Sequence, residues 1–177
     1  MEKIDALRSR LPDDARDLKL NLQSVLTNSS LEPRQRWGVA LAVAHALDAP
    51  ALREAVLGDA AAEVDDATLS DARAAAALMG MNNVYYRFRH FMDHAGAAED
   101  YALPARLRMN RIARPATDKE SFELYCLAVS AVAGCELCVT SHEKVVRQAG
   151  LSAEQVHDAV RIAAVLAGVA TALRFTP

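Results

Sequence analysis

The sequence of 177 residues predicts an all-α protein that folds as one helical domain of about eight helices. Apolar residues recur at helical spacing, as Trp37, Leu41 and Ala44 do, along almost the whole chain. A sustained alternation of apolar and polar residues, which would be typical of strands, is absent. Ser152 and Gln155 have the spacing of a capping box, in which each side chain pairs with a backbone amide at a helix start.

Helix-breaking residues divide the chain into these helices, since proline and glycine interrupt a helix while serine and aspartate begin one. In chain order the breaks are Pro12, Ser29–Ser30 with Pro33, Asp48 with Pro50, Asp65–Asp66, Gly96, Pro104, Pro115, Gly134 and Gly150. We expect one helix from Glu120 to Ala133, which Gly134 ends in a left-handed turn. A long last helix should run from Ser152 to about Arg174.

Composition and charge exclude several classes of function. With 52% hydrophobic and 24% charged residues, the chain is expected to be globular and large enough for one core. The net charge is −3 and the basic residues are scattered, so nucleic acid is not an expected partner. The charged N-terminus lacks an apolar signal core, and the longest apolar run, Ile162–Leu173, is too short to span a bilayer. We therefore expect a cytoplasmic protein that is not a membrane protein.

A weak internal repeat runs through the chain. When Trp37 is aligned with Glu123, LAV in the first half matches LAV in the second, and AAALMGMNNVYYRF later matches AAVLAGVATALRF. We interpret residues 1–177 as a single domain with a degenerate first half, about 1–95, and a second half, about 104–177. In this register the chemistry belongs to the second half, because its reactive side chains have apolar counterparts: Cys135, Cys138 and His142 correspond to Ala49, Leu52 and Val56.

The stretch GCELCVTSH places two thiols beside a histidine. Cytosolic thiols are kept reduced, so such a pair is more often catalytic or metal-binding than structural. Cys138 and His142 follow Cys135 at i+3 and i+7, which puts all three side chains on one helical face. Side chains at i and i+3 lie roughly 5–6 Å apart at Cβ, so a reversible bridge between the thiols is feasible. The helix N-terminus favours a thiolate at Cys135 and His142 favours one at Cys138, which leaves open which sulfur meets an oxidant.

Zinc is the main competitor for this cluster, and an inert buried pair is the other alternative. Cys135 and His142 are separated by roughly 10 Å of helix rise, whereas zinc holds its ligand atoms about 2.0–2.3 Å from one centre. No second cysteine or histidine group follows at zinc-finger spacing. These observations favour a redox-active dithiol.

The residues around the dithiol resemble the alkyl hydroperoxidase D family, within the wider carboxymuconolactone decarboxylase-like superfamily. The resemblance rests on the pattern E-x11-CxxC-xxxH, and DLKLNL, MGMNNVYYR and LRMN extend it over nearly the whole chain. It implies an all-α homotrimer that reduces hydroperoxides with its dithiol and holds no cofactor tightly. The family is recharged by dihydrolipoamide on a lipoylated 2-oxo-acid dehydrogenase component. It can also pass electrons to the peroxiredoxin alkyl hydroperoxide reductase C.

The resemblance also assigns roles to four residues. It implies that Cys138 is oxidised to the sulfenic acid, that Cys135 is its proton donor and resolving partner, and that Glu123 and His142 form a proton relay. The family often has a histidine just before the second cysteine, where this chain has Leu137. As Leu137 is at i+2 from Cys135, about 200° around an ideal helix, we expect it to lie away from the reactive face.

Two other functions stay open. One is a decarboxylase-like enzyme of the same superfamily that uses His142 as an acid or base on a lactone. The other is a non-enzymatic helical module stabilised by zinc. Outside the site we expect a core thiol at Cys126, helix-end roles for His90 and His94, and either a subunit contact or catalysis for Asn82 and Asn83.

Overall fold

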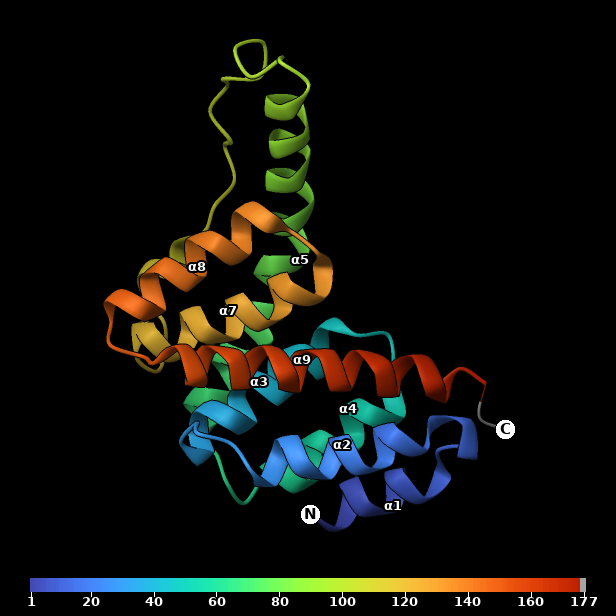
Figure 1. The fold of residues 1–177 in the computed structure, drawn as a ribbon. Coiled ribbons are helices and arrows are strands. Elements are labelled where there is room, and N and C mark those ends of the chain that lie inside the picture. The colour runs from blue at the N-terminus through green and yellow to red at the C-terminus, as the bar shows by residue number, and fades with distance from the viewer. Residues whose placement is uncertain (176–177) are drawn as a thin grey trace.

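Nine α-helices and one 3₁₀ turn make up the regular structure of residues 1–175, the part of the chain that the computed structural model describes (Figure 1). No strand occurs among these residues, so the all-α prediction is confirmed. The elements are α1 (Glu2–Arg10), η1 (Asp13–Ala15), α2 (Arg16–Thr27), α3 (Pro33–Ala46), α4 (Pro50–Ala60), α5 (Asp66–His94), α6 (Asn110–Ala113), α7 (Lys119–Ala133), α8 (Glu136–Gln148) and α9 (Ala153–Leu173).

The helix ends follow the predicted capping chemistry. Asp65 precedes α5 and accepts a hydrogen bond from the N–H of Thr68. Ser152 and Gln155 form the predicted capping box at the start of α9. Gly134 ends α7 with φ of 66°, a left-handed conformation that glycine adopts without the steric cost of a Cβ atom. Local sequence therefore fixes the turn that carries the chain from α7 into α8.

Helix α3 lies at the centre of the fold and contacts α4, α5, α7 and α9. Every residue from 37 to 44 is buried, which is the pattern of a helix that is covered on all sides. In α7 the buried run covers residues 121–130. The two helices pack closely at Gly38, where a Cβ atom would come within 2.2 Å of Cζ of Tyr125. The absence of a side chain at Gly38 thus lets α7 approach the central helix.

The order and spacing of the helices agree with the predicted internal repeat. Helices α3, α4 and α5 begin at residues 33, 50 and 66, and α7, α8 and α9 begin 86, 86 and 87 residues later. The residue before α4 is Ala49 and the residue before α8 is Cys135, so the aligned positions occupy the same place in each unit. The first unit carries buried apolar residues where the second carries the dithiol.

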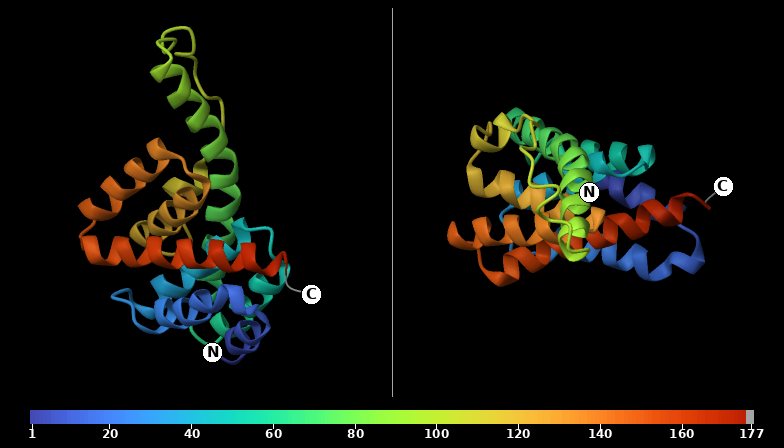
Figure 2. Two further views of the ribbon diagram at one scale, coloured as in Figure 1. Left: turned by 45° about the vertical axis from the view of Figure 1, so that its right-hand side comes forward. Right: turned by 90° about the horizontal axis from the view of Figure 1, so that it is seen from above.

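One part of the molecule projects from the helical body. The C-terminal part of α5 extends away from the other helices, and the segment that follows it returns alongside (Figures 1 and 2). We call residues 84–109 the arm. The ring of Phe88 meets that of Tyr101 edge-on, with centroids 5.2 Å apart, which ties the returning segment to the helix. The arm exposes a set of large apolar side chains: Val84, Phe88, Phe91, Tyr101 and Leu103.

Helix α9 is long and apolar enough to cross a membrane by length and composition. However, 44% of its most apolar stretch is buried inside the fold, and it contacts α2, α3 and α7. A core helix of a globular protein can have the same length and composition. Figure 1 shows α9 lying across the other helices of the fold. The expectation that the protein does not enter a membrane stays a prediction.

Candidate active site

The candidate site begins at the turn between α7 and α8. Gly134 reverses the chain, and Cys135 follows as the N-cap residue of α8 with non-helical dihedral angles of −92° and 95°. The N–H of Cys135 donates to the carbonyl of Ser130, and the Arg87 side chain donates to the carbonyl of Ala133 at 2.6 Å. Arg87 comes from α5, so this helix holds the turn in place from outside α7 and α8.

Cys135 and Cys138 are joined by a disulfide, with their Cα atoms 5.3 Å apart. The predicted proximity of the two thiols is therefore confirmed, and the structure represents the oxidised dithiol. Cys135 is completely buried, whereas 6% of Cys138 is exposed. Both sulfurs lie at the start of α8, where backbone amides and the helix dipole favour a thiolate after reduction.

Glu123 of α7 and His142 of α8 contact each other. Oε2 of Glu123 lies 2.6 Å from Nδ1 of His142, and 5% and 12% of these two side chains are exposed. Nε2 of His142 lies 3.3 Å from Sδ of Met79, which belongs to α5. Both ring nitrogens of His142 therefore have a neighbour that can take part in a hydrogen bond, a carboxylate on one side and a thioether on the other.

A cavity of about 260 Å³ opens next to the dithiol. It is lined by Asn82, Tyr86, Met109, Ile112, Leu137, Cys138, Ser141 and His142. Cys135 and Glu123 are not among the lining residues, and both are buried. A small molecule that enters the cavity therefore meets one sulfur and one imidazole, between mostly apolar walls.

The expectation that Leu137 lies away from the reactive side chains is wrong. Its side chain is 39% exposed and lines the cavity together with Cys138 and His142. The angle of about 200° assumes that Cys135 belongs to the helix. Cys135 instead stands at the N-cap position with an extended backbone, so a helical wheel does not place it relative to Leu137.

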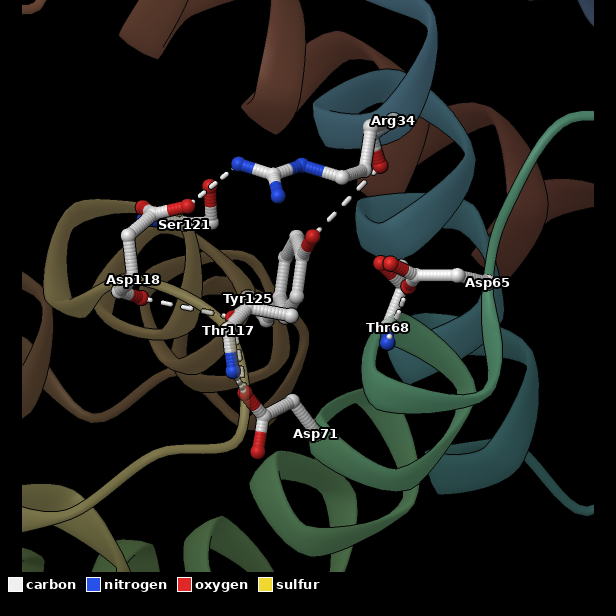
Figure 3. Close-up of polar contacts among 8 residues, drawn as sticks. All are labelled: Arg34, Asp65, Thr68, Asp71, Thr117, Asp118, Ser121 and Tyr125. Atoms are coloured by element: carbon white, nitrogen blue, oxygen red, sulfur yellow. Dashed lines mark hydrogen bonds and ion pairs between the residues drawn. The ribbon is translucent and has the colours of Figure 1, made fainter.

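A polar network anchors the start of α7, the helix that carries Glu123, and Figure 3 shows part of it. Asp71 of α5 accepts hydrogen bonds from the N–H groups of Ala116 and Thr117, at 3.0 and 2.7 Å, and from Arg111. Burial alone would raise the pKa of Asp71, but these hydrogen bonds hold it below its usual value. Asp118 caps α7 by accepting from the N–H of Ser121.

The same end of α7 is tied to α3. The Arg34 guanidinium forms an ion pair with Asp118, and the hydroxyl of Tyr125 donates to the backbone carbonyl of Arg34 (Figure 3). Sequence reasoning did not identify this network, because its members come from four helices and one loop. Its role is to support the site and not to react.

The remaining candidates lie outside the reactive cluster. Cys126 is fully buried, and burial, followed by the charges of Glu123 and Asp71, raises the pKa of its thiol. The expectation of a core thiol is therefore confirmed. His90 contacts Glu136 at 3.3 Å, and its ring centroid lies 4.2 Å from that of His94. Within residues 1–175 no group of three or more His, Cys, Asp or Glu side chains could hold a metal ion.

Helix α5 contributes Met79, which sequence reasoning did not place in the site, and Asn82, for which it left a subunit contact or catalysis open. Met79 contacts His142, and Asn82 lines the cavity. Asn82 and Asn83 are 4% and 3% exposed, so they are buried within the subunit. The signal in the sequence was two adjacent amides in an otherwise apolar stretch, since buried amides need partners.

Comparisons with known proteins agree with this geometry. Residues 98–176 match the carboxymuconolactone decarboxylase family. The chain is 60% identical to the alkyl hydroperoxide reductase AhpD of Anaeromyxobacter sp. (strain K) over 173 residues, which cover 98% of this chain and 91% of the relative. It is 59% identical to AhpD of Anaeromyxobacter dehalogenans (strain 2CP-1), with the same coverage. It is 52% identical to AhpD of Rhodospirillum centenum over 96% of this chain and 90% of the relative.

Proposed function

Because this chain belongs to the AhpD family of alkyl hydroperoxide reductases, we propose that Cys138 is the sulfur with which it attacks hydroperoxides. The chain is an oxidoreductase that reduces hydroperoxides, and the CxxC pair is its redox centre. In this proposal Cys135 resolves the oxidised Cys138, while Glu123 and His142 supply and accept protons.

One observation carries the assignment of the two sulfurs. Cys138 lines the cavity, whereas Cys135 is fully buried and does not line it. Sequence reasoning left the two sulfurs balanced, because the helix N-terminus favours one and His142 the other. A substrate in the cavity has access to Cys138 alone, and this supports Cys138 as the attacking sulfur.

The chemistry follows from the positions of the groups. The Cys138 thiolate attacks the terminal oxygen of the hydroperoxide, the O–O bond breaks, and sulfur becomes a sulfenic acid. The departing alkoxide takes a proton and leaves as an alcohol, and in this proposal His142, which lines the cavity, supplies that proton. The Cys135 thiolate then attacks the sulfur of Cys138 and displaces hydroxide, which leaves as water after protonation. The product is the Cys135–Cys138 disulfide that the structure contains.

The cavity suits an alkyl hydroperoxide. Tyr86, Met109, Ile112 and Leu137 supply mostly apolar surface to the cavity that Cys138 and His142 also line. A volume of about 260 Å³ leaves space for a small alkyl group beside the peroxide oxygens. We therefore propose organic hydroperoxides as the substrate class.

We propose dihydrolipoamide as the reductant, in the form of the lipoyl group of a 2-oxo-acid dehydrogenase component. A dithiol reduces a disulfide in two exchange steps, first as a mixed disulfide and then by closing its own ring. Only Cys138 is accessible from the cavity, so the mixed disulfide would form there. We also propose that the protein passes electrons to alkyl hydroperoxide reductase C and that it is cytoplasmic. A reducing compartment returns such a dithiol to its reduced form, which is the form that reacts with peroxide.

We further propose that the protein is a homotrimer that covers its arm. The arm exposes Phe91 at 57% and Leu103 at 65%, together with Val84 and Phe88, so these side chains are not covered within the subunit. Monomeric proteins rarely expose a contiguous apolar surface of this kind. Light scattering at micromolar concentration should give about three times the subunit mass, and a monomeric mass would contradict the proposal.

Turnover with different reductants tests the proposed function. The reduced protein should consume tert-butyl hydroperoxide in the presence of dihydrolipoamide, faster than with dithiothreitol or glutathione. Cys126→Ser is the matched control, because it removes a buried thiol outside the site and should leave turnover in place. If the double variant Cys135→Ser with Cys138→Ser turns over a lactone as fast as the wild type does, a decarboxylase-like function of His142 replaces the peroxidase.

A further inference from the structure

A second cavity adjoins the one that Cys138 lines. Its volume is also about 260 Å³. The lining residues are Tyr86, Arg89, His90, Asp93, Ala98, Tyr101 and Leu137. Tyr86 and Leu137 line both cavities, so the two cavities meet at these side chains. The chemistry proposed above uses the first cavity and gives the second no role.

The second cavity lies between the projecting part of α5 and the segment that returns beside it, since both contribute lining residues (Figures 1 and 2). The four lining residues from α5 recur at spacings of three and four and so share one face of the helix. The exposed apolar residues Val84, Phe88 and Phe91 lie on a face about 180° away on a helical wheel. A subunit contact through those three residues therefore uses the other side of α5.

The lining of the second cavity is more polar than that of the first. Arg89 carries several N–H donors, one of which lies 3.4 Å from a backbone carbonyl, and Tyr86 and Tyr101 each carry a hydroxyl. Arg89 and Tyr86 are half-buried and Tyr101 is exposed, so a ligand can reach all three side chains. Against these donors the lining holds the carboxylate of Asp93. The second cavity thus suits a group that accepts hydrogen bonds.

We propose that the second cavity binds the far end of a long-chain substrate, a fatty-acid hydroperoxide whose carboxylate accepts hydrogen bonds from Arg89. This inference rests on the proposed peroxidase function and narrows its substrate class. The peroxide group lies in the first cavity beside Cys138, and the alkyl chain crosses Leu137 into the second. Leu137 is 39% exposed, so its side chain offers apolar surface to the chain where the two cavities meet.

Chain length is the first test of the two-cavity arrangement. We would measure the single-turnover oxidation of the pre-reduced wild-type enzyme by n-butyl hydroperoxide and by nonanoic acid with a terminal hydroperoxide group. The short compound fills only the first cavity, whereas the long one also reaches the second. The long compound should react at least about tenfold faster at low concentration, because added apolar contacts raise the rate of substrate capture. Equal rate constants would overturn the proposal.

Filling the second cavity should remove this preference. Ala98 is an exposed lining residue in the turn after α5, so Ala98→Trp places an indole in the cavity without disturbing the core. The ratio of the long-chain rate to the short-chain rate should fall about tenfold in this variant. Ala95→Trp is the matched control, since Ala95 is equally exposed and lines neither cavity, and it should keep the wild-type ratio. The same ratio in both variants would contradict the proposal.

Arg89→Met tests the carboxylate contact independently of cavity volume. The variant keeps a long side chain and removes the donors, so the terminal hydroperoxide of nonanoic acid should lose about tenfold in rate relative to n-nonyl hydroperoxide. Arg114→Met is the control, because it removes the same charge from an exposed residue that lines neither cavity. Equal losses in the two arginine variants would mean that only net charge matters, and the assigned contact would be wrong.

Failure of this inference is distinguishable from failure of the proposed function. A wild-type enzyme that reduces n-butyl hydroperoxide but shows no preference for the long compound has the peroxidase activity without the second subsite. A wild-type enzyme that reacts with none of the three hydroperoxides faster than a free thiol does would overturn the proposed function itself.

Discussion

His142 of α8 and Glu123 of α7 form a short, almost fully buried contact, with Nδ1 and Oε2 2.6 Å apart. Met79 closes the other side of the imidazole at 3.3 Å. The imidazole is thus oriented from α5 and α7 while it remains on the wall of the cavity. A side chain held in this way can transfer a proton without first being reoriented by solvent.

Removal of either member of this pair should slow peroxide reduction and leave the fold intact. We expect Glu123→Gln and His142→Gln each to lower the rate of Cys138 oxidation by about 10²–10⁴-fold, because general acid–base catalysis typically accelerates a reaction by that factor. Stopped-flow measurements over a range of pH would show the loss, with far-UV circular dichroism as the check on folding. Rates within about twofold of wild type in both variants would remove the pair from the mechanism.

Serine variants of the two cysteines should stop the peroxidase reaction at different steps. Cys138→Ser cannot form a sulfenate and should show no peroxide reduction, whereas Cys135→Ser should consume one equivalent of peroxide and then stop, for lack of a resolving thiol. Trapping with dimedone followed by mass spectrometry would locate the sulfenic acid. A dimedone adduct at Cys135 in the Cys138→Ser variant would reverse the two roles.

Cys126 should take no part in the redox cycle. It is completely buried, and burial together with the carboxylates of Glu123 and Asp71 raises the pKa of its thiol, so the reactive thiolate is disfavoured. After peroxide treatment, differential alkylation with peptide mapping should find Cys126 reduced and Cys135 bonded to Cys138. A bridge that contains Cys126 would contradict the assignment of the site.

Gly38 should be needed for the packing of α3 against α7. A Cβ atom there would lie 2.2 Å from Cζ of the fully buried Tyr125, so Gly38→Ala should destabilise the protein by about 1–3 kcal/mol. Gly80→Ala is the matched control, since Gly80 is a helical glycine with nothing within 4 Å of the added Cβ, and it should stabilise by about 0.5–1 kcal/mol. Urea unfolding would measure both values, and equal effects would refute the packing argument.

Stability should fall in acid partly through Asp71. Its pKa in the folded protein lies below the unfolded value, because hydrogen bonds to the charged carboxylate outweigh burial. The resulting stabilisation is fully present above the unfolded pKa of about 4 and is lost as the pH falls through the folded value. Asp71→Asn should lower the free energy of unfolding at pH 7 and reduce its dependence on pH below about 4. A wild-type pH profile in the variant would show that Asp71 contributes nothing to it.

What the sequence by itself determined was the local structure. Gly134 ends α7, Ser152 and Gln155 begin α9, and the i, i+3 spacing of Cys135 and Cys138 brings two thiols into bonding range. These features depend on backbone geometry within a few residues, which sequence spacing encodes directly. The repeat could be read for the same reason, as it preserves the lengths between helix starts.

Only the tertiary structure decided which groups face the cavity. The packing of α7 against α8 brings Glu123 to His142 and leaves Cys138, not Cys135, on the cavity wall. The packing of α5 adds Asn82, a residue more than fifty positions away from Cys138 in the sequence. Leu137 also lines the cavity, because Cys135 is at the N-cap position and a helical wheel does not describe its place relative to Leu137. Such contacts join segments that are distant in the chain, and they depend on how whole helix faces fit together, which no local spacing specifies.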